Sequence, residues 1–294
     1  MASTRHPLQG RTAVVTGAAR GVGAALAREL SQRGVRLALL GRERDGLEQV
    51  AGSVPTRALC WEVDVSDDDA MAAVAAEVGD RMGPPSVVVA NAGVAEGGPF
   101  LETDPDTWRR VVEVNLVGSA VTARAFLPHL LDTRGHFLQV ASLASFGAAP
   151  MMSAYCASKA GVEAFAQALR AEYAHRHLTV GIAYLNWTDT DMIRDADQHA
   201  VLRELRGHMP PPARRVYSVE TVARRMAKAL ERRSTTVYVP SWLRVVQATR
   251  AALPAVVVRV SRHELARLEA GGDFAATGLL GAGGRADRAA DSGR

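Results

Sequence analysis

The chain has 294 residues, of which 48% are hydrophobic, 22% charged and 5% aromatic, and its mean hydropathy is −0.02. This composition excludes wholesale disorder, and the length is sufficient to bury a sizeable core. The net charge of +4 is small and scattered over most of the chain, which argues against nucleic-acid binding. The two cysteines, Cys60 and Cys156, provide neither a disulfide framework nor a metal-ligand cluster, so we expect no metal site.

Targeting segments are not evident in the sequence. The longest uncharged apolar run, Ala251 to Val258, has eight residues, well short of the roughly 20 that a membrane-spanning helix requires. The opening MASTRHPLQGRT lacks the apolar core of a secretory signal. We therefore expect a reduced, cytoplasmic protein.

The first 240 residues alternate short apolar runs with longer amphipathic stretches. Continuous hydrophobicity is typical of strands that are buried on both faces of a parallel sheet. Strands are predicted over 12–16, 36–40, 58–63, 86–90, 136–141, 179–185 and 236–240. Helices are predicted over 22–33, 44–51, 67–81, 105–131, 154–177 and 219–233. The repeated strand–helix alternation predicts an α/β fold with a doubly wound parallel sheet and helices on both faces.

The domain organisation follows from a change of pattern after residue 240. Residues 1–240 are predicted to form a single domain, with a substrate lid over about 189–216. Residues 241–270 are predicted to be a basic amphipathic helical extension, broken at Pro254. Residues 271–294 are rich in glycine and alanine and are predicted to be disordered.

The predicted extension accounts for the net positive charge of the chain. Residues 241–268 contain five arginines and one acid, Glu264, and an apolar side that includes Trp242, Leu243, Val245 and Val246. Three interpretations remain open. The extension packs on a neighbouring subunit, closes over the substrate pocket, or makes peripheral contact with an anionic membrane surface.

A glycine-rich turn follows the first predicted strand and leads directly into a helix. Gly17 permits the tight turn, Gly21 allows a pyrophosphate to approach the backbone, and Gly23 allows the helix to pack closely on the strand. The N-terminus of the helix offers free N–H groups to a phosphate. This context favours a dinucleotide site over a purely structural turn.

The end of the second predicted strand indicates which dinucleotide binds. An NAD site usually has an acidic residue there, whereas this strand ends in Gly41-Arg42. Arg42 and Arg20 are suited to hold a 2′-phosphate through charge-assisted hydrogen bonds, which predicts NADP(H). The alternative is that both arginines are solvated surface residues and that the cofactor is NAD(H).

A tyrosine and a lysine, Tyr155 and Lys159, lie four residues apart on one face of a predicted helix. A nearby ammonium group stabilises a phenolate, which would lower the pKa of Tyr155 and make it a general acid/base. Ser142 lies 13 residues upstream at the end of a strand, where its hydroxyl is placed to hold a substrate carbonyl oxygen.

Together these motifs resemble the short-chain dehydrogenase/reductase family, and the order and spacing match over residues 10 to about 240. The further motifs are Asp64-Val65 after the third strand, Asn91-Ala92-Gly93 after the fourth, and Asn115 in the helix that starts at Pro105. The resemblance implies a Rossmann-type sheet of seven strands. It also implies a homodimer or homotetramer assembled through the long helices around 105–131 and 154–177.

The resemblance also implies roles for individual residues. Tyr155 would transfer the proton, Ser142 would orient the substrate, and Lys159 would hold the nicotinamide ribose and lower the pKa of Tyr155. Asn115 would complete a proton relay. The cofactor contacts implied or predicted are Thr16, Gly17, Arg20, Gly21, Val22, Gly23, Arg42, Asp64, Val65, Asn91, Ala92, Gly93, Tyr155, Lys159, Thr188 and Thr190.

One stretch departs from the family pattern. Leu185-Asn186 stands where the family usually has Pro-Gly, whereas the later Asp189-Thr190-Asp191-Met192 matches, so Thr190 is still expected to reach the nicotinamide carboxamide. Asn tolerates the left-handed backbone conformation, so we expect Asn186 to preserve the turn.

The substrate side is predicted to be apolar. Its lining is expected to include Leu143, Phe146, Met152 and Met192, which suits an apolar ketone or aldehyde. The sequence thus predicts an NADP(H)-dependent oxidoreductase acting on a small carbonyl or alcohol substrate. The alternatives are an NAD(H)-dependent alcohol dehydrogenase of the same family and a cofactor-binding regulatory protein without turnover.

Overall fold

The fold is described from a computed structural model that covers residues 6–147, 149–270 and 275–291. A seven-stranded sheet forms the centre of the molecule, with the strand order β3-β2-β1-β4-β6-β7-β8 and every neighbouring pair parallel. The strands are β1 (Thr12–Thr16), β2 (Arg36–Gly41), β3 (Ala58–Glu62), β4 (Val87–Ala90), β6 (His136–Ser142), β7 (Thr179–Leu185) and β8 (Thr236–Val239). The predicted doubly wound α/β fold is confirmed.

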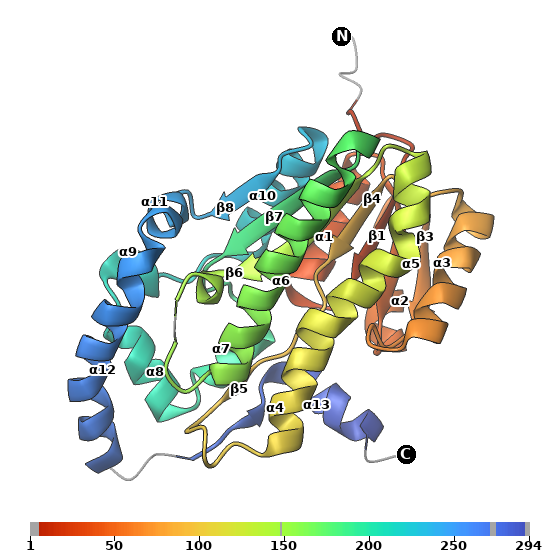
Figure 1. Ribbon diagram of the computed structural model, residues 1–294. Helices are drawn as coiled ribbons and strands as arrows, with labels where there is room; N and C mark the ends of the chain where they lie inside the picture. Colours follow the sequence, from red (N-terminus) through yellow and green to blue (C-terminus); the bar gives the residue numbers. More distant parts are fainter. Residues whose placement is uncertain (1–5, 148, 271–274, 292–294) are drawn as a thin grey trace.

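Two layers of helices cover the sheet (Figure 1). One face packs against α1 (Gly21–Gln32), α2 (Arg44–Gly52) and α10 (Val219–Glu231). The opposite face packs against α3 (Asp68–Met82), α5 (Gly118–Asp132) and α6 (Ser153–Tyr173), and α4 (Pro105–Val112) lies against α6. Alternate residues of each strand face opposite layers, so Val14 belongs to one apolar cluster while Val15 belongs to the other.

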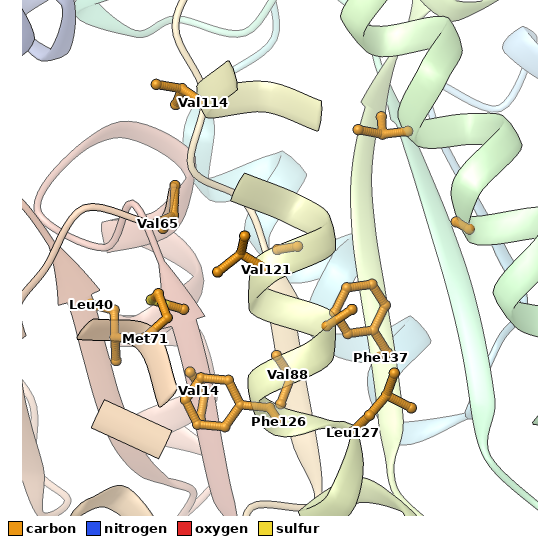
Figure 2. Packing of buried hydrophobic residues seen from close by; sticks show 14 of the residues in the cluster. Val14, Leu40, Val65, Met71, Val88, Val114, Val121, Phe126, Leu127 and Phe137 are labelled. Atoms are coloured by element: carbon orange, nitrogen blue, oxygen red, sulfur yellow. The ribbon is translucent and has the colours of Figure 1, made fainter. Parts of the chain in front are cut away.

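The larger apolar cluster fixes the sheet against α3 and α5. In Figure 2, Phe126 of α5 lies beside Val14 and Met71, and Phe137 of β6 lies close to Leu127. Phe126, Phe137 and Met71 are fully buried, and burying each such side chain contributes about 1.5–3 kcal/mol. This packing holds the carboxyl ends of the strands in fixed positions, which is what the site requires.

The helical stretch 105–132 is long and apolar enough, by composition alone, to span a membrane, with a mean hydropathy of 1.2 in its best window. Half of that window is buried inside the protein, as in a core helix. A π-helical turn, Glu113–Val117, interrupts this stretch between α4 and α5. The interruption carries Asn115 into the interior.

The extension after β8 forms two helices, α11 (Leu243–Ala248) and α12 (Leu253–Ala270). Trp242, Leu243, Val246 and Leu253 pack against the larger apolar cluster, whereas Val245 stays exposed. The helical extension is interrupted just before Pro254, as predicted: α12 starts at Leu253, and Pro254 lies in its first turn, where the missing N–H is tolerated. Helical structure in this segment agrees with the prediction, and contact with a membrane stays a prediction.

The segment predicted to be disordered is partly ordered. Residues 271–274 and 292–294 lie outside the described residues, but Gly278–Leu279 form the strand β9 and Gly281–Asp291 form the helix α13. β9 pairs antiparallel with β5 (Glu96–Gly97). The prediction was wrong for 278–291 because composition reports only local tendency, whereas Leu279 and Leu280 are buried by residues far upstream in the chain.

Candidate active site

The glycine turn has the close approaches that a phosphate-binding turn requires. Gly17 and Gly21 adopt positive φ angles of 62° and 52°. A Cβ at Gly23 would lie 2.2 Å from the Gly17 carbonyl oxygen, so only glycine fits there. The first turn of α1 contains no acidic residue, and its N-cap residue Arg20 makes no side-chain capping bond. The positive end of α1 is therefore suited to an anion.

Hydrogen bonds from β4 hold this turn. Asn91 Nδ2 donates to the carbonyls of Thr16 and Gly17 at 2.9 and 3.3 Å, and Thr16 Oγ1 accepts from the backbone N–H groups of Asn91 and Ala92. A Cβ at Gly17 would meet the Ala92 Cα at 2.8 Å. Thr16, Asn91 and Ala92 thus shape the turn, and their direct contact with a cofactor stays a prediction.

Replacing Gly23 with alanine is expected to prevent dinucleotide binding and to destabilise the fold by about 1–3 kcal/mol, because the added Cβ meets backbone atoms that cannot move independently. Isothermal titration with NADPH and urea unfolding measure the two effects. Gly52→Ala at the end of α2, where a Cβ meets nothing within 4 Å, is the matched control. Equal behaviour of the two variants would contradict the close-approach argument.

The predicted catalytic side chains meet at the carboxyl end of β6. Ser142 is the last residue of β6, and Tyr155 lies in the first turn of α6. The Tyr155 hydroxyl shares a hydrogen bond with Ser142. Lys159 follows one turn later, with Nζ 5.7 Å from the centroid of the Tyr155 ring and 3.2 Å from the Val140 carbonyl, to which it donates. The arrangement brings two hydroxyl groups and one ammonium group to the carboxyl end of β6.

Burial dominates the electrostatics of this group. It raises the pKa of Tyr155 to about 12, although the hydrogen bond with Ser142 acts in the opposite direction. It lowers the pKa of Lys159 to about 8. The predicted lowering of the Tyr155 pKa is therefore not what the described residues produce, because desolvation by burial outweighs the hydrogen bond with Ser142. The neutral phenol is the form present at pH 7, and this form is able to donate a proton.

Asn115 belongs to the π-helical turn, and its side chain is buried. Its Oδ1 accepts from the Val94 N–H at 2.8 Å, and its Nδ2 donates to the Val94 carbonyl and to Ser158 Oγ, each at 2.9 Å. A Cβ at Gly93 would lie 3.0 Å from Asn115 Oδ1 and 3.6 Å from Lys159 Nζ. Asn115 therefore lies close to Lys159 and fixes the loop after β4. Its part in a proton relay stays a prediction.

Sequence reasoning missed Glu96, which holds the start of α6, the helix that carries Tyr155 and Lys159. Glu96 is 1% exposed, and its Oε1 accepts from the backbone N–H groups of Ala154 at 2.8 Å and Tyr155 at 3.4 Å. A carboxylate at this place satisfies two free donors of the first turn of α6. Burial raises the pKa of Glu96, although these backbone bonds oppose the shift. An acid within an otherwise apolar stretch after Gly93 was the only sequence signal.

A second polar cluster lies at the tip of β2, where the predicted adenosine end of the cofactor site is located. Arg42 contacts Asp64 and Asp287. Arg110 of α4 was not predicted; its Nε and Nη2 donate to the two carboxylate oxygens of Asp287 at 2.8 and 2.9 Å. Arg110 also contacts Asp64, at 2.5 Å, and Glu113, at 3.5 Å. Two guanidinium groups thus converge on one buried carboxylate.

Asp64, one of the predicted cofactor contacts, also belongs to this cluster. Burial would raise the pKa of Asp64, but hydrogen bonds from Ser66 and the charge of Arg110 lower it below its ordinary value. The neighbouring Val65 is buried against Gly118. Arg20, the other predicted phosphate ligand, pairs with Glu43 at the base of α2. Val22 is partly buried against the apolar cluster on the α1 side of the sheet.

The loop after β7 differs from the expected turn. Asn186 does not have a positive φ, so the predicted left-handed turn is wrong. The Asn186 side chain instead donates to the carbonyls of Ala213 and Arg215, which ties the base of the lid to the sheet. Thr188 is buried and donates to the Asn186 carbonyl, and the Thr190 methyl group lies near Gly21. Thr190 therefore faces the glycine turn.

The segment predicted to be a substrate lid, about 189–216, contains three short helices, α7 (Asp191–Ala196), α8 (Ala200–Gly207) and α9 (Pro211–Arg214). Met152 and Met192 join a small apolar cluster with Ala196 and Leu280, against which Tyr155 packs. Their predicted place in the lining of a substrate pocket stays a prediction. Leu143 is partly buried against the larger core.

Phe146 was wrongly predicted to line the pocket. Its side chain is 4% exposed and packs against the Tyr184 ring, with the centroids 4.7 Å apart. A short 3-10 turn, Leu143–Ser145, follows β6 and directs Phe146 into the core, where burying its ring is more favourable than exposing it.

Comparisons with known proteins agree with this geometry. A family model described as short chain dehydrogenase matches residues 11–200. The chain is 35% identical to meso-2,3-butanediol dehydrogenase of Serratia marcescens over 164 residues, which are 55% of this chain and 65% of that protein. It is 36% identical to cis-4-hydroxycyclohexanecarboxylate dehydrogenase of Sinomonas cyclohexanicum over 188 residues, 62% of this chain and 75% of that protein.

A solved structure shows the same fold. The crystal structure of a short-chain type dehydrogenase/reductase from Mycobacterium marinum superposes with a TM-score of 0.72 at 23% sequence identity. The superposition covers 79% of this chain and 94% of that one.

Proposed function

Because the chain belongs to the short-chain dehydrogenase family, we propose that it reduces an apolar ketone or aldehyde with NADPH as the hydride donor. Membership makes it an oxidoreductase that interconverts CH–OH and C=O groups with a nicotinamide dinucleotide. The choice of NADPH and of an apolar substrate is our proposal. The convergence of Arg42 and Arg110 on one carboxylate at the tip of β2 is the observation that supports NADPH most directly.

The glycine turn and the uncapped start of α1 fit the pyrophosphate of a dinucleotide. At the other end of the site, Ser142 donates a hydrogen bond to the substrate oxygen, and Tyr155 transfers its proton to that oxygen as the C=O group becomes CH–OH. Lys159, below its pKa of about 8, is a cation that stabilises the phenolate left on Tyr155. The cofactor supplies the hydride that the carbonyl carbon receives.

The substrate class is inferred from the apolar groups beside Tyr155. Met152, Met192 and Ala196 form a cluster without a charged member, and such a lining favours apolar substrates over phosphorylated or sugar-like ones. The two relatives named above are, by name, dehydrogenases of a diol and of a hydroxycyclohexane acid. A screen of cyclic and linear ketones, aldehydes and alcohols with NADPH and NADH tests the proposal. Turnover confined to phosphorylated or sugar substrates would overturn the apolar assignment.

Arg42→Ala tests the cofactor preference. The variant is expected to weaken NADPH binding by about 10–100-fold, the loss of one charge-assisted hydrogen bond, while the Kd for NADH changes little. Titration calorimetry with both cofactors measures this difference. Arg44→Ala is the matched control, because Arg44 lies two residues away and pairs with the exposed Glu48. An equal loss of affinity for both cofactors, or no loss of affinity, would contradict the proposed NADPH preference.

A further inference from the structure

The segment 275–287, hereafter the tail segment, runs along the edge of the sheet where the active site lies. In Figure 1 the strand β5, with which β9 pairs, and the helix α13 lie on the same side of the molecule as α4 and α7. The backbone of the tail segment is fixed by hydrogen bonds from Thr277 N to the Gly97 carbonyl at 2.7 Å and from Leu280 N to the Ala95 carbonyl at 2.8 Å. The tail segment is thus bound to the loop that follows β4.

One end of the tail segment lies at the substrate side. Leu280 is 1% exposed and shares an apolar cluster with Met152, against which Tyr155 and Met192 also pack. The next residue, Gly281, donates its N–H to Asp195 Oδ2 at 2.7 Å. These contacts place the tail segment against the catalytic tyrosine and the first helix of the lid.

The other end of the tail segment lies at the tip of β2. Asp287 is 4% exposed, and its carboxylate binds Arg42 and, through two hydrogen bonds, Arg110. Between the two ends, Arg285 Nη1 lies 3.4 Å from Asp195 Oδ2. Burial lowers the pKa of Arg20, and the positive charge of Arg285 lowers it further. The tail segment therefore extends from the substrate side, past the glycine turn, to Arg42 and Arg110, hereafter the arginine pair.

We propose that the tail segment is a built-in competitor of the cofactor, with the Asp287 carboxylate in the place of the 2′-phosphate and Leu280 beside the catalytic tyrosine. The inference rests on the proposed binding of NADP(H) at Arg42. Cofactor binding and docking of the tail segment then exclude each other, so NADPH binds only to molecules whose tail segment has moved away.

The charges explain why the two states exclude each other. A 2′-phosphate and the Asp287 carboxylate are both anions that require the same guanidinium groups, and side by side they would repel. Withdrawing Asp287 shifts the charge of the cluster formed by Arg42, Arg110 and Asp64 by one unit towards positive. The arginine pair remains, and it is then able to bind the phosphate.

Two glycines of α13 provide a matched pair of variants. Gly281 has a positive φ of 77°, and a Cβ there would lie 2.7 Å from the Met192 Cα, so Gly281→Ala is expected to dislodge the tail segment. Gly283 lies two residues further along, and a Cβ there meets nothing within 4 Å. Gly283→Ala is therefore the control for a methyl group added to the same helix. Asp287→Asn removes the competing charge without changing the side-chain shape.

The affinities for NADPH and for 2′,5′-ADP, which carries the adenosine end alone, are measured for the four full-length proteins. If the tail segment is docked in about nine molecules of ten, freeing it strengthens binding about tenfold. Gly281→Ala and Asp287→Asn are expected to bind both ligands about tenfold more tightly than the wild type, with Gly283→Ala unchanged. Unchanged or weaker binding by Gly281→Ala and Asp287→Asn would overturn the proposal.

Hydrogen exchange reports directly whether the tail segment is docked, whichever cofactor is bound. Binding of NADPH is expected to speed exchange of the amides of 278–287, and slower exchange would show that the tail segment closes over the cofactor and would overturn the proposal. The same measurement with NADH separates the two proposals. If Arg42→Ala weakens the binding of NADPH and NADH equally, or of neither, but NADH still speeds exchange at 278–287, the cofactor assignment fails and the competition by the tail segment stands.

Discussion

Tyr155→Phe is expected to lower kcat for carbonyl reduction by about 10²–10⁴-fold and to leave the Kd for NADPH within about twofold. The variant keeps the ring and its packing beside Met152 and Met192, and it removes only the hydroxyl that shares a hydrogen bond with Ser142. The reaction then lacks its proton donor, while the groups at the cofactor turn are unaffected. Steady-state rates and NADPH titrations measure the two quantities separately.

The pH dependence of the two reaction directions provides a second test of the same residue. Reduction requires the neutral phenol, which predominates at neutral pH because burial raises the pKa of Tyr155 to about 12. Oxidation requires the phenolate, so its rate is expected to rise with pH as the phenolate fraction grows below that pKa. Tyr173→Phe, at the far end of α6, is the control. Reduction by Tyr155→Phe within tenfold of the wild type would exclude Tyr155 as the proton donor.

His136 is expected to make the fold sensitive to acid. The side chain is 1% exposed, and burial lowers its pKa to about 3, with the charges of Arg233 and Arg170 outweighing a backbone contact with Leu230. In the unfolded chain histidine has a pKa of about 6.5. Below that value the unfolded chain binds a proton that the folded protein cannot, so stability falls as the pH drops from 6.5 towards 3, by about 5 kcal/mol in total.

His136→Asn isolates this effect, because asparagine does not titrate. Between pH 6.5 and pH 4.5 the free energy of unfolding of the wild type is expected to fall by about 2 kcal/mol more than that of the variant. Urea unfolding at the two pH values measures the difference, in which the carboxyl groups common to both proteins cancel. The exposed His175 gives the control, His175→Asn. Parallel losses in the wild type and in His136→Asn would contradict the proposed cause.

The sheet and the glycine turn were predictable because local signals determine them. The run TAVVT followed by Gly17, Gly21 and Gly23 predicts a buried strand and a tight turn from neighbouring residues alone, and the structure has both. Tyr155 and Lys159 were predictable for a similar reason, since a spacing of four residues places both on one helix face. Helix and strand periodicity therefore determined the main parts of the candidate site.

The arrangement around Asp287 was not predictable, because it depends on contacts between distant segments. Asp287 lies in a stretch of glycine and alanine without apolar periodicity, and its partner Arg110 comes from a helix 177 positions earlier in the chain. The depth at which Tyr155 is buried could not be predicted from the sequence either, and this burial reversed the predicted direction of the pKa shift of Tyr155. The prediction for Phe146 was wrong for the same reason, because a short turn after β6 determines whether its side chain points into the pocket or into the core.

The pairing of β9 with β5 also has a consequence for the order of folding. Glu96 is paired with Leu279, 183 positions later, so a ribosome finishes the whole sheet, both helical layers and the catalytic residues before the tail segment leaves its exit tunnel. During that interval the glycine turn and the arginine pair are already assembled. If the tail segment competes as proposed, a growing chain is able to bind the cofactor before its competitor has left the ribosome.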